Sequence, residues 1–208
     1  MADLKTEEEQ VEELKKWWKE NGRSVIAGLV IGIGIIFAWQ GWQQYRASQA
    51  AQASATYRQL SQAVIAGHAE AADTLYQRLR DDFGGTPYVA FGALDLARMK
   101  VDADKLGEAR VYLDWAKDNA PDEGLKQVAR LRLVRVLLAL GDLDVATRIV
   151  EEPGVAAFDA EMSALRGDLA LAKGDTAAAR AAYRKALEGD VANPAFIRMK
   201  LNDLAPSS

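Results

Sequence analysis

The feature that most constrains this chain is an uncharged stretch near its N-terminus. Residues 24–45 contain no charged side chain, and residues 25–39 are apolar at every position. About 20 helical residues at a rise of 1.5 Å span the ~30 Å hydrocarbon core of a bilayer, so this stretch is long enough to cross it. Its aliphatic and phenylalanine side chains together favour insertion by about 3–5 kcal/mol. The sequence therefore predicts one transmembrane helix over residues 23–45, preceded by a tail of residues 1–22.

Aromatic residues stand at both ends of the predicted span. Trp17 and Trp18 precede it, while Trp39, Trp42 and Tyr45 close it. Along a helix Trp18 and Trp39 lie about 32 Å apart, which places them at opposite headgroup layers, where tryptophan is enriched. The alternative is that these rings pack against other helices.

A cleaved signal peptide is the main competitor of a permanent anchor. Such peptides begin with a short basic region, whereas this chain begins with five glutamates within residues 7–13. The small-residue pattern Ala51-Gln52-Ala53, which a signal peptidase could cut, lies well beyond the apolar run. Both features favour an anchor that is retained.

Basic residues near the ends of the span predict its orientation. Four precede the span and two follow it: Lys15, Lys16, Lys19, Arg23, Arg46 and Arg58. Because cytoplasmic flanks carry the excess of lysine and arginine, we expect the N-terminus in the cytoplasm and the large C-terminal part on the outer side.

Within the span, Gly28 and Gly32 form a GxxxG pattern that Gly34 and Ala38 continue. Small residues at this spacing let a second helix approach closely. The pattern favours a helix partner in the membrane. The alternative is that glycine is simply common in membrane helices.

The remaining residues, 46–208, read as helix almost throughout. Residues 48–65 lack glycine and proline, so we expect the membrane helix to continue into the first outer helix. Turn-forming residues divide the rest into helices of about 10–18 residues. These interruptions are Gly67-His68, Gly84-Gly85-Thr86-Pro87, 102–104, Pro121, Gly141-Asp142, Pro153-Gly154, Gly174-Asp175 and Gly189-Asp190.

The spacing of small and aromatic residues indicates a repeat. The clearest unit contains Gly167, Gly174-Asp175, Ala179, Tyr183 and Ala186-Leu187. Gly141-Asp142 with Ala146 reproduces its centre about 33 residues earlier, close to the period of about 34 in tetratricopeptide-like helical hairpins. Two fainter copies are Ala109 with Leu113, Ala116 and Pro121, and Ala72 with Tyr76, Leu79 and Pro87. An ordinary helical bundle with coincidental alanine spacing is the alternative.

These patterns predict an all-α chain: one N-terminal transmembrane helix, then a tetratricopeptide-like α-solenoid of about three to four hairpins. One hairpin cannot bury its apolar stripe alone, so successive hairpins must stack. The apolar residues after Pro194 suit a terminal helix that covers the last hairpin: Phe196, Ile197, Met199, Leu201 and Leu204.

No residue pattern supports catalysis, a cofactor, a metal site or a small-molecule substrate. The chain has no cysteine, and its one histidine, His68, falls in a predicted turn. The formal net charge of −4 and a pI near 5.2 argue against a nucleic-acid partner. We therefore expect a binding protein rather than an enzyme.

Solenoids of this kind bind ligands on the concave side, which the first helix of each hairpin forms. The periodicity places seven residues there: Phe91, Leu94, Arg98, Leu131, Arg135, Leu138 and Asp168. Mixed apolar and charged side chains suit a peptide or a partner's helix. The alternative is that several of the seven are buried core.

Read together, the segments of the chain resemble a known family. The sequence combines Glu13–Gly22, a glycine-rich span with Trp39 and Trp42, degenerate repeats, and the stretches Leu131–Val136 and Leu165–Asp168. In this order they resemble the ancillary subunit of the bacterial SecYEG translocon over essentially the whole chain.

The resemblance implies a single-pass protein of the bacterial inner membrane with a periplasmic repeat domain. It implies two partners, the SecYEG translocon and a membrane-anchored periplasmic chaperone of the prolyl-isomerase type, and a role in passing secreted proteins to periplasmic chaperones. It carries no catalytic residue. The alternative function is a cell-envelope scaffold, or a negative regulator of a stress response that acts through the cytoplasmic tail.

Overall fold

The computed structural model describes residues 7–204, and these form helices and short connections with no strand. The helices are α1 (Glu7–Ile65), α2 (Ala69–Phe83), α3 (Pro87–Asp102), α4 (Leu106–Asn119), α5 (Glu123–Leu140), α6 (Leu143–Glu151), the short 3-10 turn η1 (Ala156–Phe158), α7 (Asp159–Ala172), α8 (Thr176–Glu188) and α9 (Pro194–Asp203). The predicted all-α class is confirmed. The first six residues of the predicted tail lie outside the described range.

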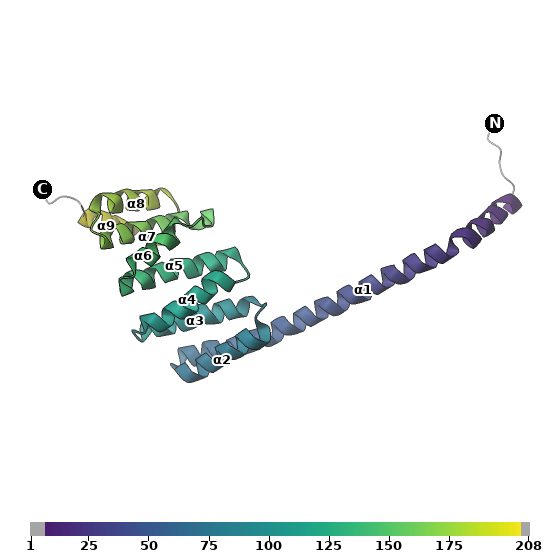
Figure 1. The fold of residues 1–208 in the computed structure, drawn as a ribbon, viewed down its shortest axis with the longest axis horizontal. Coiled ribbons are helices and arrows are strands. Elements are labelled where there is room, and N and C mark those ends of the chain that lie inside the picture. The colour runs from purple at the N-terminus through teal and green to yellow at the C-terminus, as the bar shows by residue number, and fades with distance from the viewer. Residues whose placement is uncertain (1–6, 205–208) are drawn as a thin grey trace, which may run out of the picture. The chain divides into compact units, whose positions relative to one another are not determined.

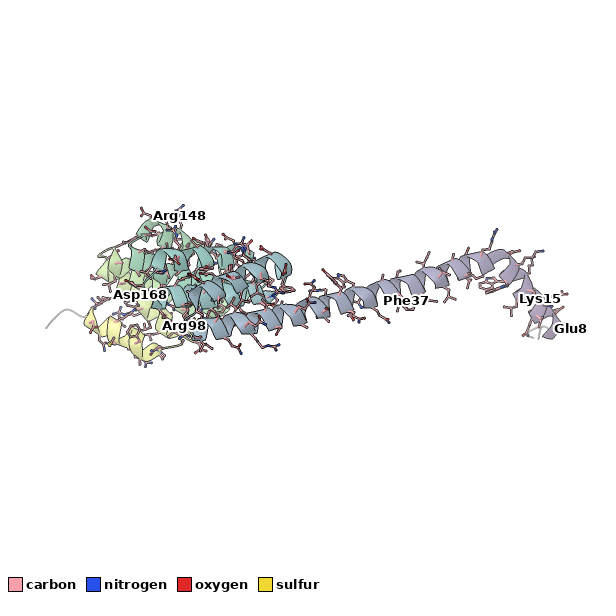
Figure 2. All side chains as sticks on the ribbon, turned by 90° about the horizontal axis from the view of Figure 1, so that it is seen from below. Glu8, Lys15, Phe37, Arg98, Arg148 and Asp168 are labelled. Carbon is pink, nitrogen blue, oxygen red and sulfur yellow. The ribbon has the colours of Figure 1, made fainter. Side chains whose placement is uncertain are left out.

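Helix α1 contains the predicted membrane span and continues to Ile65, as the lack of glycine and proline in 48–65 indicated. The chain divides into two compact units between Gln49 and Ala50. In the first unit the apolar side chains of α1 are exposed, with Phe37 at 69% (Figure 2), and none of the residues in its most apolar window is buried. A core helix of a soluble protein would bury them. Among the described residues, α1 alone is long and apolar enough to span a membrane.

The second unit is a stack of helical hairpins. Residues 50–65 of α1 pair with α2, and α3/α4, α5/α6 and α7/α8 follow in chain order, with α9 last (Figure 1). The sequence therefore predicted both the hairpin architecture and the number of repeats.

One buried alanine near the start of the second helix of each hairpin explains the repeat spacing. These alanines are fully buried: Ala72, Ala109, Ala146 and Ala179. Their small side chains let the paired helices approach closely. One turn later a larger buried residue fills the space between hairpins: Tyr76, Leu113, Val150 and Tyr183. Alanine and the larger residue recur because each hairpin is packed against the next in the same way.

The turn inside each hairpin has the same backbone form. One residue in each takes a left-handed conformation: Gly67, Asp104, Gly141 and Gly174. The amide of the following residue donates to a carbonyl five residues earlier, for example Asp142 N to Leu137 O at 2.9 Å, which closes a Schellman-type helix end. Glycine suits this conformation because it has no Cβ, and Asp104 adopts it in the α3–α4 turn.

Helix α9 covers the end of the stack, as expected. Ile197 is buried in a small core with Ala179, Tyr183 and Ala186, while Leu201 and Leu204 pack against that core. Phe196 and Met199 are exposed, so the prediction that all five apolar residues of this segment cover the last hairpin is wrong for these two. The helix buries a narrower stripe than its composition suggests.

Three buried side-chain atoms among the described residues lack a hydrogen-bond partner, and the Tyr76 hydroxyl is the one that lies in the aromatic part of the core. The Tyr76 hydroxyl is buried and has no hydrogen-bond partner among the described residues, while its ring packs edge-on against Tyr112 and Trp115. A buried hydroxyl without a partner loses its hydration and gains nothing in return. Burial also raises the pKa of this phenol, because the charged form is the more costly one to desolvate.

We expect Tyr76→Phe to stabilise the fold by about 1 kcal/mol at neutral pH, since it removes only the unsatisfied hydroxyl. The gain grows above about pH 10, where the tyrosine ionises in the unfolded chain but keeps its proton in the folded one, so that wild-type stability falls as pH rises. Urea unfolding followed by circular dichroism at pH 7 and above pH 10 measures both effects. Tyr183→Phe is the matched control, because it removes a hydroxyl that donates a 2.6 Å hydrogen bond to Asp168 and should therefore destabilise the fold at pH 7. Equal changes in stability of the two variants at pH 7 would contradict the conclusion that the Tyr76 hydroxyl is unsatisfied.

Candidate protein-binding surface

Two hollows lie side by side on the face formed by the first helices of the hairpins. The α3–α5 hollow, of about 290 Å³, is lined by Ala97, Arg98, Val101, Leu106, Leu113, Arg132, Arg135, Val136 and Ala139. The α5–α7 hollow, of about 570 Å³, is lined by Arg135, Leu138, Ala139, Asp168, Leu171, Ala172, Lys200, Asp203 and Leu204. Arg135 and Ala139 belong to both and stand one helical turn apart on α5. The hollows therefore adjoin along this helix.

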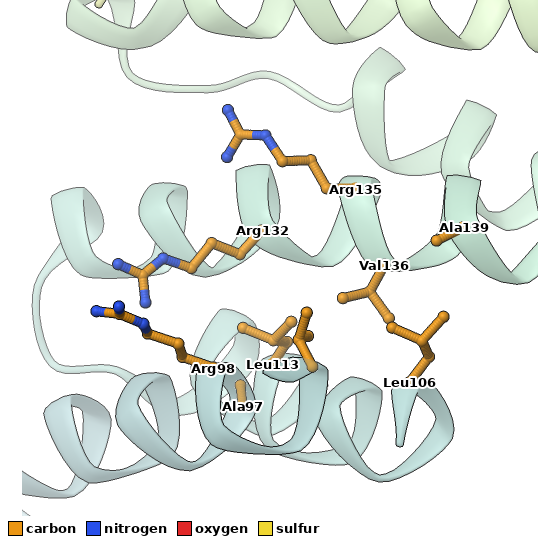
Figure 3. Close-up of a pocket in the computed structure, with 9 residues that line it drawn as sticks. Ala97, Arg98, Leu106, Leu113, Arg132, Arg135, Val136 and Ala139 are labelled. Carbon is orange, nitrogen blue, oxygen red and sulfur yellow. The ribbon is translucent and has the colours of Figure 1, made fainter. Parts of the chain in front are cut away.

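The α3–α5 hollow combines an apolar floor with a basic rim. Leu106 and Val136 lie at one end, whereas the guanidinium groups of Arg98 and Arg132 lie close together at the other (Figure 3). Arg135 extends its guanidinium group to the same side (Figure 3). None of the described residues that line this hollow is acidic. Such a surface offers apolar contact and positive charge together.

The three arginines of this rim are weakly engaged within the chain. Arg98 faces Asp102 at 3.8 Å, and both side chains are largely exposed, so the pair contributes little. Arg132 donates to the Leu94 carbonyl at a long 3.4 Å. Arg135 forms no hydrogen bond or ion pair with any other described residue. Much of their hydrogen-bonding capacity is therefore free for a ligand.

In the α5–α7 hollow, Asp168 is already committed to the fold. Its carboxylate accepts hydrogen bonds from the Tyr183 hydroxyl and the Lys200 ammonium, each at 2.6 Å. Burial and the bond to Asp168 raise the pKa of the Tyr183 phenol. Lys200 also lies 4.6 Å above the Phe196 ring. This network connects α9 to α7 and α8. Because its charge is already paired with Lys200, Asp168 serves mainly to position the walls of the hollow.

The structure divides the seven predicted groove residues. Arg98, Arg135, Leu138 and Asp168 line the two hollows. Leu94 and Leu131 are each 6% exposed and belong to the main core, which corrects their placement on the concave surface. Phe91 is half-buried against Tyr57 and Tyr88 and lines neither hollow.

Tyr57 fixes this aromatic group to α3. Its hydroxyl donates to Asp95 at 2.9 Å, and burial together with that bond raises its pKa to about 12. The contact joins the last turns of α1 to α3, so Phe91 belongs to the packing of the first two hairpins.

Sequence reasoning missed Arg132 and Lys200. A signal for Arg132 was present, because α5 is otherwise mostly apolar between Val128 and Leu140 and places Arg132, Arg135 and Ala139 on one face. Lys200 had no such signal, since its role depends on the contact of α9 with Asp168 in α7.

The glycines of the membrane span stand on an open helix surface. A Cβ added at Gly28, Gly32 or Gly34 would meet nothing within 4 Å. These positions therefore leave room for close approach of another helix, and their role in helix packing stays a prediction.

The residues with catalytic potential are dispersed. His68 is exposed in the turn before α2. Among the described residues, no group of three or more histidine, aspartate or glutamate side chains is placed to hold a metal ion.

Known proteins are similar in sequence to almost the full chain. The family model of the tetratricopeptide repeat-like domain matches residues 15–206. The ancillary SecYEG translocon subunit of Haemophilus influenzae is 34% identical over 205 residues, which cover 98% of this chain and 100% of that protein. The ancillary SecYEG translocon subunit of Escherichia coli is 31% identical over 211 residues, which cover 99% and 100%. The chain belongs to the ancillary SecYEG translocon subunit family.

Membership confirms the resemblance that the residue order suggested. The ancillary SecYEG translocon subunit family carries a tetratricopeptide repeat-like domain and is not an enzyme family. With the one long apolar helix of α1, membership in this family fits a single-pass membrane protein.

Proposed function

We propose that this chain is an accessory subunit of the Sec translocon that helps to pass secreted proteins to periplasmic chaperones. The observation that carries the proposal is the near full-length similarity to relatives named for the SecYEG translocon. In this proposal residues 1–22 are cytoplasmic, residues 23–45 cross the bacterial inner membrane, and residues 46–208 are periplasmic. The chain acts by binding and does no chemistry on its partners.

The arrangement of the chain suits this role. An anchored protein is confined to the membrane surface where a secreted chain emerges, so its local concentration there is high without tight binding. The concave surface of the stack, with its two hollows, is the part that we propose to contact partner proteins. A membrane-anchored chaperone of the prolyl-isomerase type is the proposed second partner.

The glycine face of α1 is the proposed contact inside the membrane. Gly28 and Gly32 lie one turn apart on one side of the helix, whereas Gly34 is rotated by about 200° from Gly32 and lies on the other side. In lipid, helices associate through close packing rather than through the hydrophobic effect, so an open glycine face is the most favourable place for a translocon or chaperone helix.

The test is site-specific photo-crosslinking in native membranes. A photoreactive residue at Gly28 or Gly32 is expected to trap translocon or chaperone components that mass spectrometry identifies. Val30 is the matched control, because at about 100° per residue it projects from the opposite side of the helix. Self-dimers alone, or equal yields at Val30 and Gly32, would count against the proposal.

The lack of native cysteine gives a direct check of orientation. A single cysteine in place of Glu123 should react with a membrane-impermeant maleimide added to the periplasmic side, since the Glu123 side chain is 76% exposed. A single cysteine in place of Glu12 should react only after the membrane is opened. The reverse pattern would overturn the assigned topology.

A further inference from the structure

The basic rim of the α3–α5 hollow stands out against the charge of the whole protein. The chain carries a formal net charge of −4, yet Arg98, Arg132 and Arg135 gather on one hollow. Asp102 faces Arg98 at 3.8 Å, and Arg135 shares the α5–α7 hollow with Asp168, which is bound by Tyr183 and Lys200, and with Asp203. Three like charges with this weak compensation disfavour the free state slightly, and an anionic ligand relieves that cost.

We propose that this hollow binds an acidic amphipathic segment of a partner protein. The segment inserts an aliphatic side chain between α3, α4 and α5 and places carboxylates against Arg98, Arg132 and Arg135. This inference rests on the proposed function, since it names the chemistry of the partner that the concave surface takes.

The floor of the hollow accounts for the aliphatic side chain. Val101, Leu106 and Val136 present apolar surface, and Val101 is 40% exposed although it is a large apolar residue. Insertion of a leucine-sized side chain removes this surface from water, at about 25 cal/mol for each Å² buried. A volume of about 290 Å³ accommodates such a side chain but not a folded domain.

The adjoining hollow extends the same contact. Ala139 lines both hollows, so a small side chain stands where the two adjoin. In the α5–α7 hollow, Leu138, Leu171 and Leu204 supply apolar surface for a second anchor. We therefore place one acidic residue of the partner near Arg135, between two aliphatic anchors that occupy the two hollows.

Arginine chemistry accounts for the carboxylates. Each guanidinium group presents a planar fork of donors that matches a carboxylate, and such charge-assisted bonds are stronger than neutral ones. Arg135 gives up no bond to a described residue when it binds. A free anion would use the arginines alone and leave the apolar floor in water, so a dependence on the aliphatic side chain separates a peptide from simple ion binding.

The test uses the full-length protein in detergent micelles and a short fluorescein-labelled peptide. The probe carries two leucines four residues apart with aspartates around them. We expect fluorescence anisotropy to show binding that weakens with salt, since charge pairs at the rim are screened. Arg135→Glu should weaken it about tenfold or more. Ala139→Phe, which places a bulky ring where the two hollows adjoin, should weaken peptide binding without a change of charge.

Three matched controls make the outcome decisive. Arg148→Glu makes the same charge change at an exposed residue of α6 that lines neither hollow, on the edge opposite Arg98 (Figure 2), and should bind as the wild type does. Probes with alanine for leucine, or lysine for aspartate, should bind at least about tenfold more weakly. Equal loss in Arg135→Glu and Arg148→Glu, or equal binding of the alanine probe, would overturn the inference.

Failure here is distinguishable from failure of the proposed function. If translocon components crosslink to Gly32 but the acidic peptide does not bind, the partner chemistry assigned to the hollow is wrong and the accessory role stands. If the peptide binds but no translocon component is trapped, the hollow is correctly assigned and the location is wrong. Circular dichroism of each variant checks that the helices remain folded.

Discussion

Replacing Gly167 by alanine is expected to destabilise the repeat unit by about 2 kcal/mol, although alanine is the better helix former. Gly167 lies in α7 with its Cα against the ring of Tyr183 in α8, and a methyl group placed there would overlap that ring. Tyr183 is fully buried and its hydroxyl is held by Asp168, so the ring has no free space into which to move. Urea or thermal unfolding followed by circular dichroism measures the loss.

The control for Gly167→Ala is the same substitution at Gly107. Gly107 lies in α4, where an added methyl would meet nothing within 4 Å. The stability of the Gly107→Ala variant should therefore stay within about 0.5 kcal/mol of the wild type or rise. In a Tyr183→Ala background the cost of Gly167→Ala should largely vanish, because the ring that it strikes is gone. A cost that persists in that background would show that Gly167 is needed for another reason.

The repeat unit could be predicted because its sequence signals are local. Each hairpin turn contains a glycine or an aspartate, and each second helix places an alanine four residues before a larger apolar residue, as Ala179 and Tyr183 do. Helical hairpins contact mainly their neighbours along the chain, so these local signals were enough to fix the stack. The membrane span was predictable for a similar reason, since length and hydropathy alone identify it.

Which residues line the two hollows was harder to predict, because it depends on the rotation of each helix about its axis. Leu94 and Leu131 share a helical stripe with Arg98 and Arg135, four residues later, and periodicity alone placed them together. In the stack, α3 and α5 each contact a partner helix and both neighbouring hairpins. A wide part of their circumference is therefore buried, and it includes Leu94 and Leu131. The exposed stripe of α5 runs through Arg132, Arg135 and Ala139, while Leu131 and Val136 on either side of it are buried.

Arg130 is a residue whose role no sequence pattern revealed. It is 7% exposed, and its guanidinium group donates to three backbone carbonyls, those of Ile149, Glu152 and Pro153, at 2.8–3.0 Å. These carbonyls belong to the end of α6 and the connection after it, about 20 residues along the chain. Nothing in the sequence distinguishes Arg130 from the other arginines of α5, because the carbonyls that it binds come from the end of α6 and the irregular connection after it.

We expect Arg130→Ala to destabilise the repeat unit by about 3 kcal/mol, which lowers the melting temperature by roughly 6–12 °C. The substitution leaves carbonyls at the end of α6 without their donor. Because α6 has only nine residues, its own backbone hydrogen bonds give it little stability. Arg166 still donates to the Val150 carbonyl at 2.6 Å, so the loss should be partial and local. Hydrogen exchange should therefore rise in α6 and in the connection to α7 more than in α2 or α3.

Two variants test whether the stabilisation by Arg130 comes from the geometry of its guanidinium group or from its positive charge alone. Arg130→Lys keeps the positive charge but loses the planar fork that reaches several carbonyls at once, so it should recover less than half of the stability. Arg148→Ala removes an exposed arginine from α6 itself and should change stability by no more than about 0.5 kcal/mol. Full recovery in Arg130→Lys would mean that a point charge near the C-terminal end of α6 is sufficient, through its attraction to the helix dipole. Only the graded order, with lysine between alanine and arginine and nearer to alanine, agrees with a guanidinium group that binds three carbonyls together.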